Sequence, residues 1–300
     1  MSHRPLTPAD LPAVAAFLAE DETHVFGRPS RLGLADVTAW LAEVDLERNT
    51  WLFEDRGEIA AVAWAEVEEH HDAGFAVGVV HRDRQGRGLG SRLVDLFEAR
   101  LRELGSGRLH SVTLAPETAA ASLLTARGYR EVRRFWEMTI ELGEEAPPDP
   151  VVPDGLRLER FSEESARGFH AALDEAFADH WEHQPSPFES WWERQVARPD
   201  HDPSLWFLVR DADEVVAAAR NDPERSGGGW IGSLGVRPAW RGRGLAKALL
   251  LASFREFHRR GQRRVGLGVD SENTTGATKL YESVGMVVDS EQVVWEKKLA

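Results

Sequence analysis

The chain has 300 residues, of which 42% are hydrophobic, and a formal net charge of −14. This length suits two domains of ordinary size, and the composition argues against wholesale disorder. A sequence without cysteine excludes disulfides, thiolate metal sites and a cysteine nucleophile, and the acidic balance disfavours nucleic acid as a partner. The chain has no long apolar run, and the segment MSHRPLTPADLP has no apolar signal core. We therefore expect a cytoplasmic protein with no membrane partner.

The predicted elements recur in the same order in both halves of the chain. Each half opens with a helical segment, TPADLPAVAAFLAE or SEESARGFHAALDEAFADHW. A strand, a polar turn and a second strand follow, in NTWLFEDRGEIAAVAWAEV and PSLWFLVRDADEVVAAARN. Next come an apolar segment ending in Gly-Val, a glycine-rich loop and an amphipathic helix. The apolar side of that helix is formed by Leu89, Leu93, Phe97 and Leu101, or by Leu245, Leu249, Ala252 and Phe257.

A short strand, a short helix with a glycine stop and a final strand complete each half. The repetition predicts an α/β (α+β) fold of two tandem domains, each with a mixed, mostly antiparallel sheet flanked by helices. We place the domains at residues 1–145 and 156–300, joined by a linker at 146–155 within the segment GEEAPPDPVVPDG. The final strands, FWEMTIEL and QVVWEKKL, are expected to close their own domains. The fused pair is expected to act as a monomer, itself a pseudo-dimer, or as a homodimer.

The densest group of possible metal ligands is EEHHDAG, at residues 68–74. None of the histidines lies in a pattern such as H-E-x-x-H. We interpret this segment as a solvated hairpin turn, and we expect no metal.

The two glycine-rich loops, VHRDRQGRGLGSRLV and VRPAWRGRGLAKALL, have a layout that suits phosphate. Glycine allows a tight turn and close approach of a ligand, and the first N–H groups of the following helix favour an anion. Arginines and a lysine add charge-assisted contacts. Each loop could be a plain strand-to-helix turn, but two copies in matched settings disfavour that interpretation. Neither loop has the Gly-Lys-Ser/Thr of a Walker motif or the G-x-G-x-x-G of a dinucleotide fold.

The loops resemble the signature Gln/Arg-x-x-Gly-x-Gly/Ala of the GNAT acetyl-CoA-dependent N-acetyltransferases. It is present as Gln85-x-x-Gly88-x-Gly90 and as Arg241-x-x-Gly244-x-Ala246. SENTTGATKLYESVGM is similar to a second signature, an Asn followed by a short helix with Leu-Tyr and a terminal Gly; Met286 replaces the usual aromatic residue. The resemblance covers nearly the whole chain as two tandem GNAT domains, and among tandem members it is greatest to the mycothiol synthase group.

The resemblance implies that acetyl-CoA lies between two splayed strands, with its pantetheine on the strand before the loop and its pyrophosphate on the loop. The implied contacts in the C-terminal domain are Leu234, Gly235, Val236, Arg241, Gly242, Arg243, Gly244, Leu245, Ala246 and Asn273. Those in the N-terminal domain are Gly78, Val79, Val80, Gln85, Gly86, Arg87, Gly88, Leu89 and Gly90.

The resemblance also implies direct attack of an amine on the thioester, which suits a chain without cysteine. A backbone N–H near Val236 would stabilise the oxyanion, and Tyr281 matches the general acid that protonates the departing thiolate. A simpler interpretation of Tyr281 is a tyrosine that only packs. Asn273 would contact the cofactor and brace the turn, and it could equally be a helix N-cap.

The general base is left open, because the strand GGWIGSLGV offers only Ser233 as a polar side chain. The amine could instead lose its proton through water to a neighbouring acid, for which the candidates are Asp174, Glu175, Asp179 and His180. An acidic and aromatic wall suits a cationic amine, and the Trp-rich segment HWEHQPSPFESWWERQ is predicted to form a lid. The residues predicted to bind the acceptor are Asp179, His180, Trp181 and Ser233, with Asp174, Glu175 and Trp230 as further candidates.

The two halves are not equivalent, since Leu124 aligns with Tyr281 and Pro116 aligns with Asn273. We therefore predict that the C-terminal domain catalyses, and that the N-terminal domain is structural or holds acetyl-CoA without turnover. Acceptor amines from the mycothiol pathway, from antibiotics and from peptide N-termini stay open. A non-catalytic acetyl-CoA sensor and an unrelated nucleotide-binding protein are the alternatives from other classes.

Overall fold

The computed structural model describes residues 1–67, 72–198, 200–273 and 275–299. It contains two compact units. Unit 1 comprises Met1–Trp136, Asp270–Glu272 and Ser290–Ala300, and unit 2 comprises Glu137–Val269 and Asn273–Asp289. Each unit is a mixed α/β structure, which confirms the predicted fold class. Most of the His-rich segment predicted to be a hairpin turn, residues 68–71, lies outside the described residues.

Unit 1 is built on a sheet with the strand order β1-β2-β3-β4-β5-β12. Neighbouring strands are antiparallel, except that β4 and β5 run parallel. The strands are β1 (His3–Arg4), β2 (Thr50–Asp55), β3 (Glu58–Val67), β4 (Ala73–Val80), β5 (Arg108–Leu114) and most of β12 (Val287–Lys298). The helices are α1 (Leu11–Phe26), α2 (Leu34–Trp40), α3 (Leu46–Asn49), α4 (Leu89–Glu103) and α5 (Thr118–Ala126).

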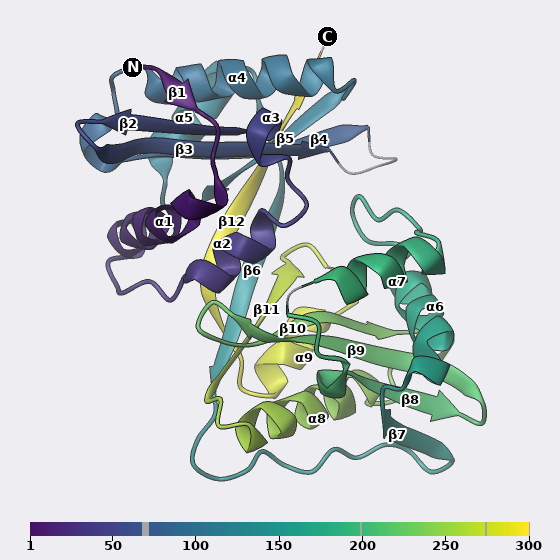
Figure 1. Ribbon diagram of the computed structural model, residues 1–300. Helices are drawn as coiled ribbons and strands as arrows, with labels where there is room; N and C mark the ends of the chain where they lie inside the picture. The colour runs from purple at the N-terminus through teal and green to yellow at the C-terminus, as the bar shows by residue number, and fades with distance from the viewer. Residues whose placement is uncertain (68–71, 199, 274, 300) are drawn as a thin grey trace. The chain divides into compact units, whose positions relative to one another are not determined.

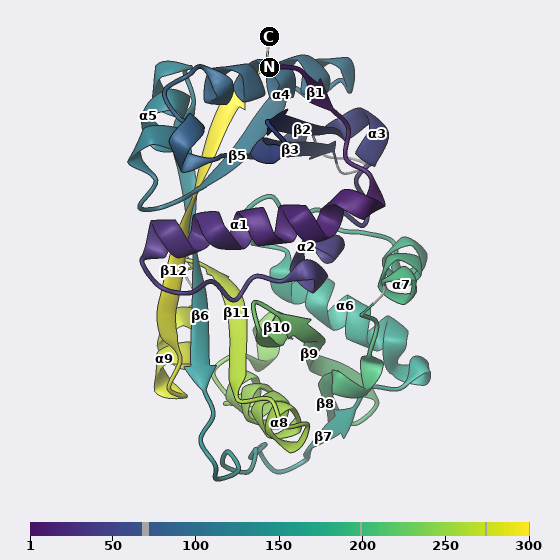
Figure 2. The ribbon, with the colours of Figure 1, turned by 60° about the vertical axis from the view of Figure 1, so that its left-hand side comes forward.

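Residues of β2 alternate between the two faces of this sheet. Trp51 and Phe53 belong to the core cluster under α4, whereas Leu52 belongs to the cluster under α1 and α2. Figures 1 and 2 show α4 on one face of the sheet and α1 on the other. The four residues predicted for the buried side of α4 are all buried: Leu89, Leu93, Phe97 and Leu101.

Unit 2 repeats this plan with the strand order β6-β11-β10-β9-β8-β7. Its strands β10 and β11 are the parallel pair. The strands are β7 (Leu156–Arg160), β8 (Phe207–Asp211), β9 (Glu214–Arg225), β10 (Gly228–Val236), β11 (Arg264–Asp270) and the second part of β6 (Arg130–Glu141). The helices are α6 (Ala166–Phe177), α7 (Phe188–Ala197), α8 (Leu245–Arg259) and α9 (Ala277–Ser283).

The two faces of the unit 2 sheet are covered by different helices. Helix α8 packs on one face through Leu245 and Leu249, which are buried against β8 and β9. Helix α6 packs on the other face, where the Gly235 position on β10 lies against Ala176. In Figure 1, α6 and α7 lie next to each other and α8 lies on the opposite side of the strands.

The final strands do not close the domains to which the sequence assigned them. The second part of β6 belongs to unit 2, where it lies beside β11. Residues Gln292–Lys298 of β12 pair with β5 of unit 1. Trp295 and Val293 are buried in the unit 1 core under α4, and Met138 on β6 is fully buried. The predicted division at residues 145 and 156 is therefore wrong for these two strands, because a strand pattern specifies the strand and not its partner.

The segment at residues 143–149, which includes the start of the predicted linker, contacts α8 of unit 2. His258 Nε2 on α8 lies 3.1 Å from the carbonyl oxygens of Gly143 and Glu144, and Arg255 Nη2 lies 3.0 Å from Asp149. Within the described residues, no helix is both long and apolar enough to cross a membrane.

Candidate active site

The glycine-rich loops of the two units have the same backbone conformation. Gly242 and Gly244 have φ values of +76° and +82°, and Gly86 and Gly88 have values of +71° and +83°. Only glycine adopts this left-handed region at little cost. A β-carbon at any of these four positions would meet nothing within 4 Å. Each loop is therefore an open concave backbone that a ligand can approach closely.

The first signature residue braces each loop. Gln85 Nε2 donates to the Val80 carbonyl at 3.3 Å, and Arg241 Nε donates to the Val236 carbonyl at 3.2 Å. Arg241 Nη2 also donates to the carbonyl of Ala176 at the end of α6, at 3.0 Å. Gln85 and Arg241 hold the loop against the preceding strand. Because these side chains are used in that way, a ligand would contact the loop backbone and the other cations nearby.

A positive surface remains at the start of α8. Ala248 N–H donates to the Gly244 carbonyl at 3.0 Å, which begins the helical hydrogen-bond series. The N–H groups of the preceding turn face the loop, as at any helix N-terminus. Arg243 and Lys247 are exposed beside them. Arg243 Nη2 donates to the Ala239 carbonyl at 3.2 Å, whereas Arg237 pairs with Glu175. The loop thus fits a pyrophosphate through backbone N–H groups, the helix dipole and two cations.

The parallel strands of each unit separate before the loop. β10 and β11 pair only from Gly229 to Ile231 on β10, and β4 and β5 pair only from Ala73 to Ala76 on β4. The register of β10 against β9 also shifts between Ile231 and Ser233, which is a β-bulge. The strand ends that the sequence assigned to pantetheine, Leu234–Val236 and Gly78–Val80, therefore do not pair with the parallel neighbouring strand. This separation is what the two splayed strands of the resemblance require.

Tyr281 lies on α9 with only 7% of its surface exposed. Burial raises its pKa to about 12. In the part of the chain that the structure describes, its hydroxyl has no hydrogen-bond partner. The equivalence with Leu124 is supported by the backbone: Met286 N–H donates to the Tyr281 carbonyl at 3.1 Å, and Tyr129 N–H donates to the Leu124 carbonyl at 3.0 Å. Leu124 packs in the unit 1 core.

Asn273 braces the turn that follows β11. Its Oδ1 accepts from Thr275 N–H at 2.8 Å and from the Thr275 hydroxyl at 2.5 Å. The residue at the N-cap of α9 is Gly276, so Asn273 is not that cap. Its contact with the cofactor stays a prediction.

Two of the candidates for the acid that takes the amine proton lie on α6 beside basic side chains. Asp174 lies 3.2 Å from His183 Nε2, and Glu175 pairs with Arg237. Asp179 is exposed. The His180 ring packs on Phe177 at a centroid distance of 4.4 Å, and Trp181 is the next residue in the chain. The predicted acceptor residues of this segment thus lie directly after α6.

The Trp-rich segment forms α7, and its aromatic rings pack against α6 and the core. The Trp191 ring lies tilted against that of His170, at 5.0 Å between ring centroids, and Trp192 stacks on Phe188 at 6.2 Å. Trp230, on β10, is 5% exposed and lies against the Gly266 position of β11. These rings act mainly as packing, and whether α7 also covers an acceptor stays a prediction.

Sequence reasoning missed a charged cluster on β9. Arg220 and Asp222 form an ion pair at 2.5 Å, and Arg198 joins them at 3.1 Å from Asp222. The signal was present in VVAAARND, where two charges interrupt a buried strand. Ser233, a predicted acceptor residue, is paired with Arg220 across the sheet.

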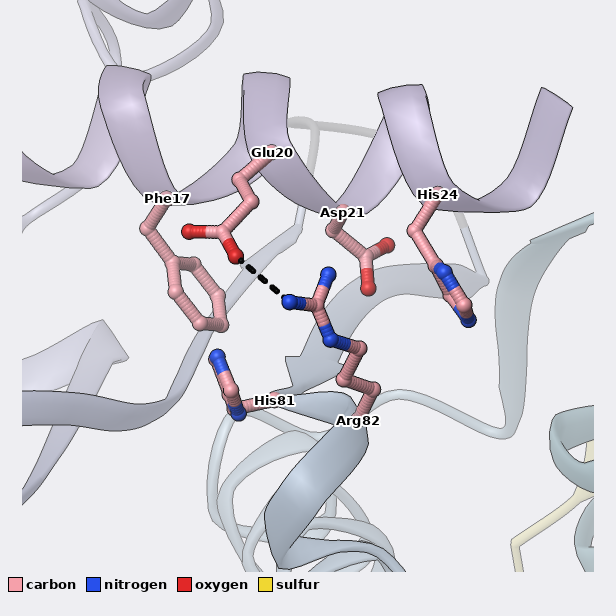
Figure 3. A pocket seen from close by; sticks show the side chains of 6 residues that line it. All are labelled: Phe17, Glu20, Asp21, His24, His81 and Arg82. Carbon is pink, nitrogen blue, oxygen red and sulfur yellow. Dashed lines mark ion pairs between the residues drawn. The ribbon is translucent and has the colours of Figure 1, made fainter. Parts of the chain in front are cut away.

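The corresponding part of unit 1 is a small acidic pocket between α1 and the end of β4 (Figure 3). Glu20 and Arg82 form an ion pair across it at 3.2 Å. Burial, together with Glu117, Glu20 and Glu22, raises the pKa of Asp21 to about 7. The pocket also contains His24, His81 and Phe17.

Residues 15–129 and 166–286 match the acetyltransferase (GNAT) family. The chain belongs to this family and contains two GNAT regions in tandem. It is 33% identical to the mycothiol acetyltransferase of Thermobispora bispora, over 78% of each chain. It is 29% identical to that of Acidothermus cellulolyticus, over 98% of this chain and 93% of the relative.

Solved structures agree with this assignment. A GCN5-related N-acetyltransferase from Sphaerobacter thermophilus is 33% identical, with a TM-score of 0.87 over 99% of this chain and 95% of that one. A tandem GNAT protein from the clavulanic acid biosynthesis pathway shares the fold, with 14% identity and a TM-score of 0.72 over 100% of this chain and 98% of that one.

Proposed function

We propose that the chain is an acetyl-CoA-dependent N-acetyltransferase in which unit 2 transfers the acetyl group directly to the amine of a small-molecule acceptor. One difference between the units carries this proposal. Both units have the open glycine-rich loop and the separated strands, but Tyr281 in unit 2 is replaced by Leu124 in unit 1. Because a leucine side chain has no proton to donate, unit 1 lacks the predicted general acid.

Acetyl-CoA supplies an activated thioester. The loop after β10 binds the pyrophosphate through backbone N–H groups, Arg243 and Lys247, and the open edge of Leu234–Val236 pairs with the pantetheine. N–H groups at this edge donate to the thioester oxygen as negative charge develops on it. Burial keeps the Tyr281 hydroxyl protonated at neutral pH, so it is available to donate a proton to the departing thiolate.

The amine loses its proton to water in this scheme. Asp174 lies 3.2 Å from His183 Nε2, Glu175 pairs with Arg237, and β10 carries no carboxylate. The names of the relatives support testing an acceptor from the mycothiol pathway first, before antibiotic amines and peptide N-termini.

Unit 1 is either a structural unit or a site that holds acetyl-CoA without turnover. The matched glycine conformations favour retained binding.

A calorimetric titration with acetyl-CoA tests both parts of the proposal, using the wild type, Gly244→Val and the matched Gly88→Val. Valine at either position would have to adopt a left-handed backbone, so it should disrupt the loop. We expect Gly244→Val to abolish binding in unit 2 together with activity, and Gly88→Val to leave activity unchanged. A wild type that binds no acetyl-CoA would contradict the proposal. Two sites per chain would indicate that unit 1 still binds the cofactor.

A further inference from the structure

The opening between β10 and β11 has a closed inner end. The two strands are paired as far as Ile231 and Leu267 and separate beyond these residues. In the proposed function, pantetheine pairs with Leu234–Val236 and the pyrophosphate binds the loop that follows. The thioester end of the cofactor therefore points back along β10, and an acyl chain longer than acetyl would extend towards the place where the strands meet. We call this place the apex of the opening.

The indole ring of Trp230 lies at the apex. A β-carbon on Gly266 of β11 would lie 2.7 Å from Trp230 Cζ3 and 2.9 Å from its Cε3. A β-carbon on Gly268 would lie 3.9 Å from Trp230 Cζ2. The six-membered part of the indole thus lies across β11, in the space that these two glycines leave free.

The ring extends past the last pair of residues. Trp230 is paired with Gly266, but its ring also reaches Gly268, which follows Leu267 at the end of the pairing. Continuing the register by one step places Gly268 level with position 232, two residues before Leu234. Two residues of a strand span about 7 Å. An acyl chain directed at the apex would therefore meet the indole after only a few methylene groups.

The ring is on the face of the sheet that α6 covers. A β-carbon on Gly229 would lie 2.4 Å from Phe257 Cδ1 on α8, and successive side chains of a strand point to opposite faces. Trp230 therefore points to the α6 side, where Gly235 also meets α6. Trp230 is 5% exposed, whereas Gly268 is exposed. The buried ring thus borders the open part of the separated strands.

Neighbouring groups hold the indole in place. Arg225 Cζ lies over the ring at 4.5 Å from its centroid, which is a cation–π contact. On β6, Thr139 is buried, and its Cγ2 lies 3.5 Å from the position of a β-carbon on Gly266. Because the ring has a cation on its face and packed strands beside it, displacing it by an acyl chain would be costly.

Unit 1 has different residues at the equivalent point. Phe75 on β4 is paired with His110 on β5, in the register that corresponds to Trp230 with Gly266. Each of the two aromatic residues follows a glycine that faces the helix after the glycine-rich loop. The side chain of His110 is buried. The glycine that admits an indole across the neighbouring strand therefore occurs in the unit that contains Tyr281.

We propose that Trp230 determines the length of the acyl group that unit 2 accepts, by closing the apex to chains longer than acetyl. The inference rests on the proposed function of unit 2. A longer chain would have to displace the buried indole or leave its methylene groups in water, and either result weakens binding. Arg225 and Gly266 are positioning residues, because they act on the acyl group only through Trp230.

Calorimetric titration with acetyl-CoA, butanoyl-CoA and hexanoyl-CoA tests this inference without an acceptor amine. The full-length Gly88→Val chain serves as the parent, so that a site in unit 1 does not contribute. We expect the parent to bind hexanoyl-CoA about tenfold or more weakly than acetyl-CoA. Adding Trp230→Ala should lower this ratio of dissociation constants about 10- to 100-fold, because the vacated space takes up the extra methylene groups. Trp230→Phe should give an intermediate ratio.

Two further variants separate closure of the apex from a general effect of losing an indole. A β-carbon on Gly268 has no neighbour closer than 3.9 Å, so valine fits there. In the Trp230→Ala chain, Gly268→Val should refill the apex and restore the weak binding of hexanoyl-CoA. Trp192→Ala removes an indole from α7 and should leave the ratio unchanged. Circular dichroism shows whether each variant is folded.

Equal affinity of the parent chain for the three donors would overturn the proposal. An unchanged ratio in the folded Trp230→Ala chain would do the same, and Trp230→Phe decides the question if the alanine variant does not fold. The proposed function would stand in these cases, because acetyl-CoA would still bind. A wild type that binds none of the three donors would contradict the proposed function itself, and the inference with it.

Discussion

Trp295 donates its indole N–H to the hydroxyl of Thr113 at 3.0 Å, although the two residues come from opposite halves of the sequence. Trp295 lies on β12 and Thr113 on β5. The strand order of unit 1 ends with this pair of strands. The N-terminal half of the chain therefore depends on the last residues of the C-terminal half for its core.

Trp295→Ala should destabilise unit 1 by about 3 to 5 kcal/mol, because it removes a large buried side chain from a closed core. Chemical denaturation followed by circular dichroism measures the loss. Val287→Ala is the control on the same strand, since Val287 is 63% exposed. Equal effects of the two substitutions would contradict the assignment of β12 to the unit 1 core.

Tyr281→Phe should lower kcat about 10²- to 10⁴-fold, the usual contribution of a positioned general acid. Acetyl-CoA binding should be retained, because the loop after β10 is untouched. The chain has two tyrosines, so Tyr129→Phe is a matched control: Tyr129 is also buried, in unit 1. Steady-state kinetics measures kcat for the wild type and both variants. Full activity in Tyr281→Phe would remove the tyrosine from the mechanism.

Arg241→Ala should raise the KM for acetyl-CoA about tenfold or more, since the loop loses hydrogen bonds to Val236 and Ala176. Arg241→Gln should have a smaller effect, because Gln85 makes the equivalent bond to the strand in unit 1. If alanine and glutamine gave the same KM, bracing of the loop would not be the role of this residue.

The Asp21 carboxyl predicts a pH dependence of stability. Its pKa is raised from 3.8 to about 7 in the folded chain. The folded state therefore holds a proton that the unfolded state releases, and stability falls as the pH rises from about 4 to about 7. Asp21→Asn should raise Tm at pH 8 by roughly 2 °C, about 1 kcal/mol after allowance for solvent screening. The gain should disappear near pH 4. A gain independent of pH would exclude this carboxyl as its source.

Much of the fold could be predicted because the chain repeats itself. Each glycine-rich loop is a local feature, so the conformations of Gly88 and Gly244 followed from the pattern of glycines, and the buried sides of α4 and α8 followed from helical spacing. Tyr281 was found through its match to a known signature, and alignment of the two halves then gave Leu124 as its counterpart.

The missed features depend on contacts between distant segments. Nothing local in β6 or β12 specifies which strand each will pair with. Arg220, Asp222 and Arg198 meet only when β9 folds against the segment after α7, so their spacing in the sequence gave no motif. The contacts of Asp174 with His183 and of Glu175 with Arg237 likewise could not be predicted from the sequence.

The exchange of β6 and β12 has an evolutionary consequence. Unit 1 has leucine at the predicted acid position, and a copy without the tyrosine could ordinarily be deleted. Here the first half of the gene encodes β6, which lies beside β11 in unit 2, so deletion would leave the surviving sheet with an exposed edge and a missing strand. Selection for unit 2 alone would therefore preserve the sequence of both halves.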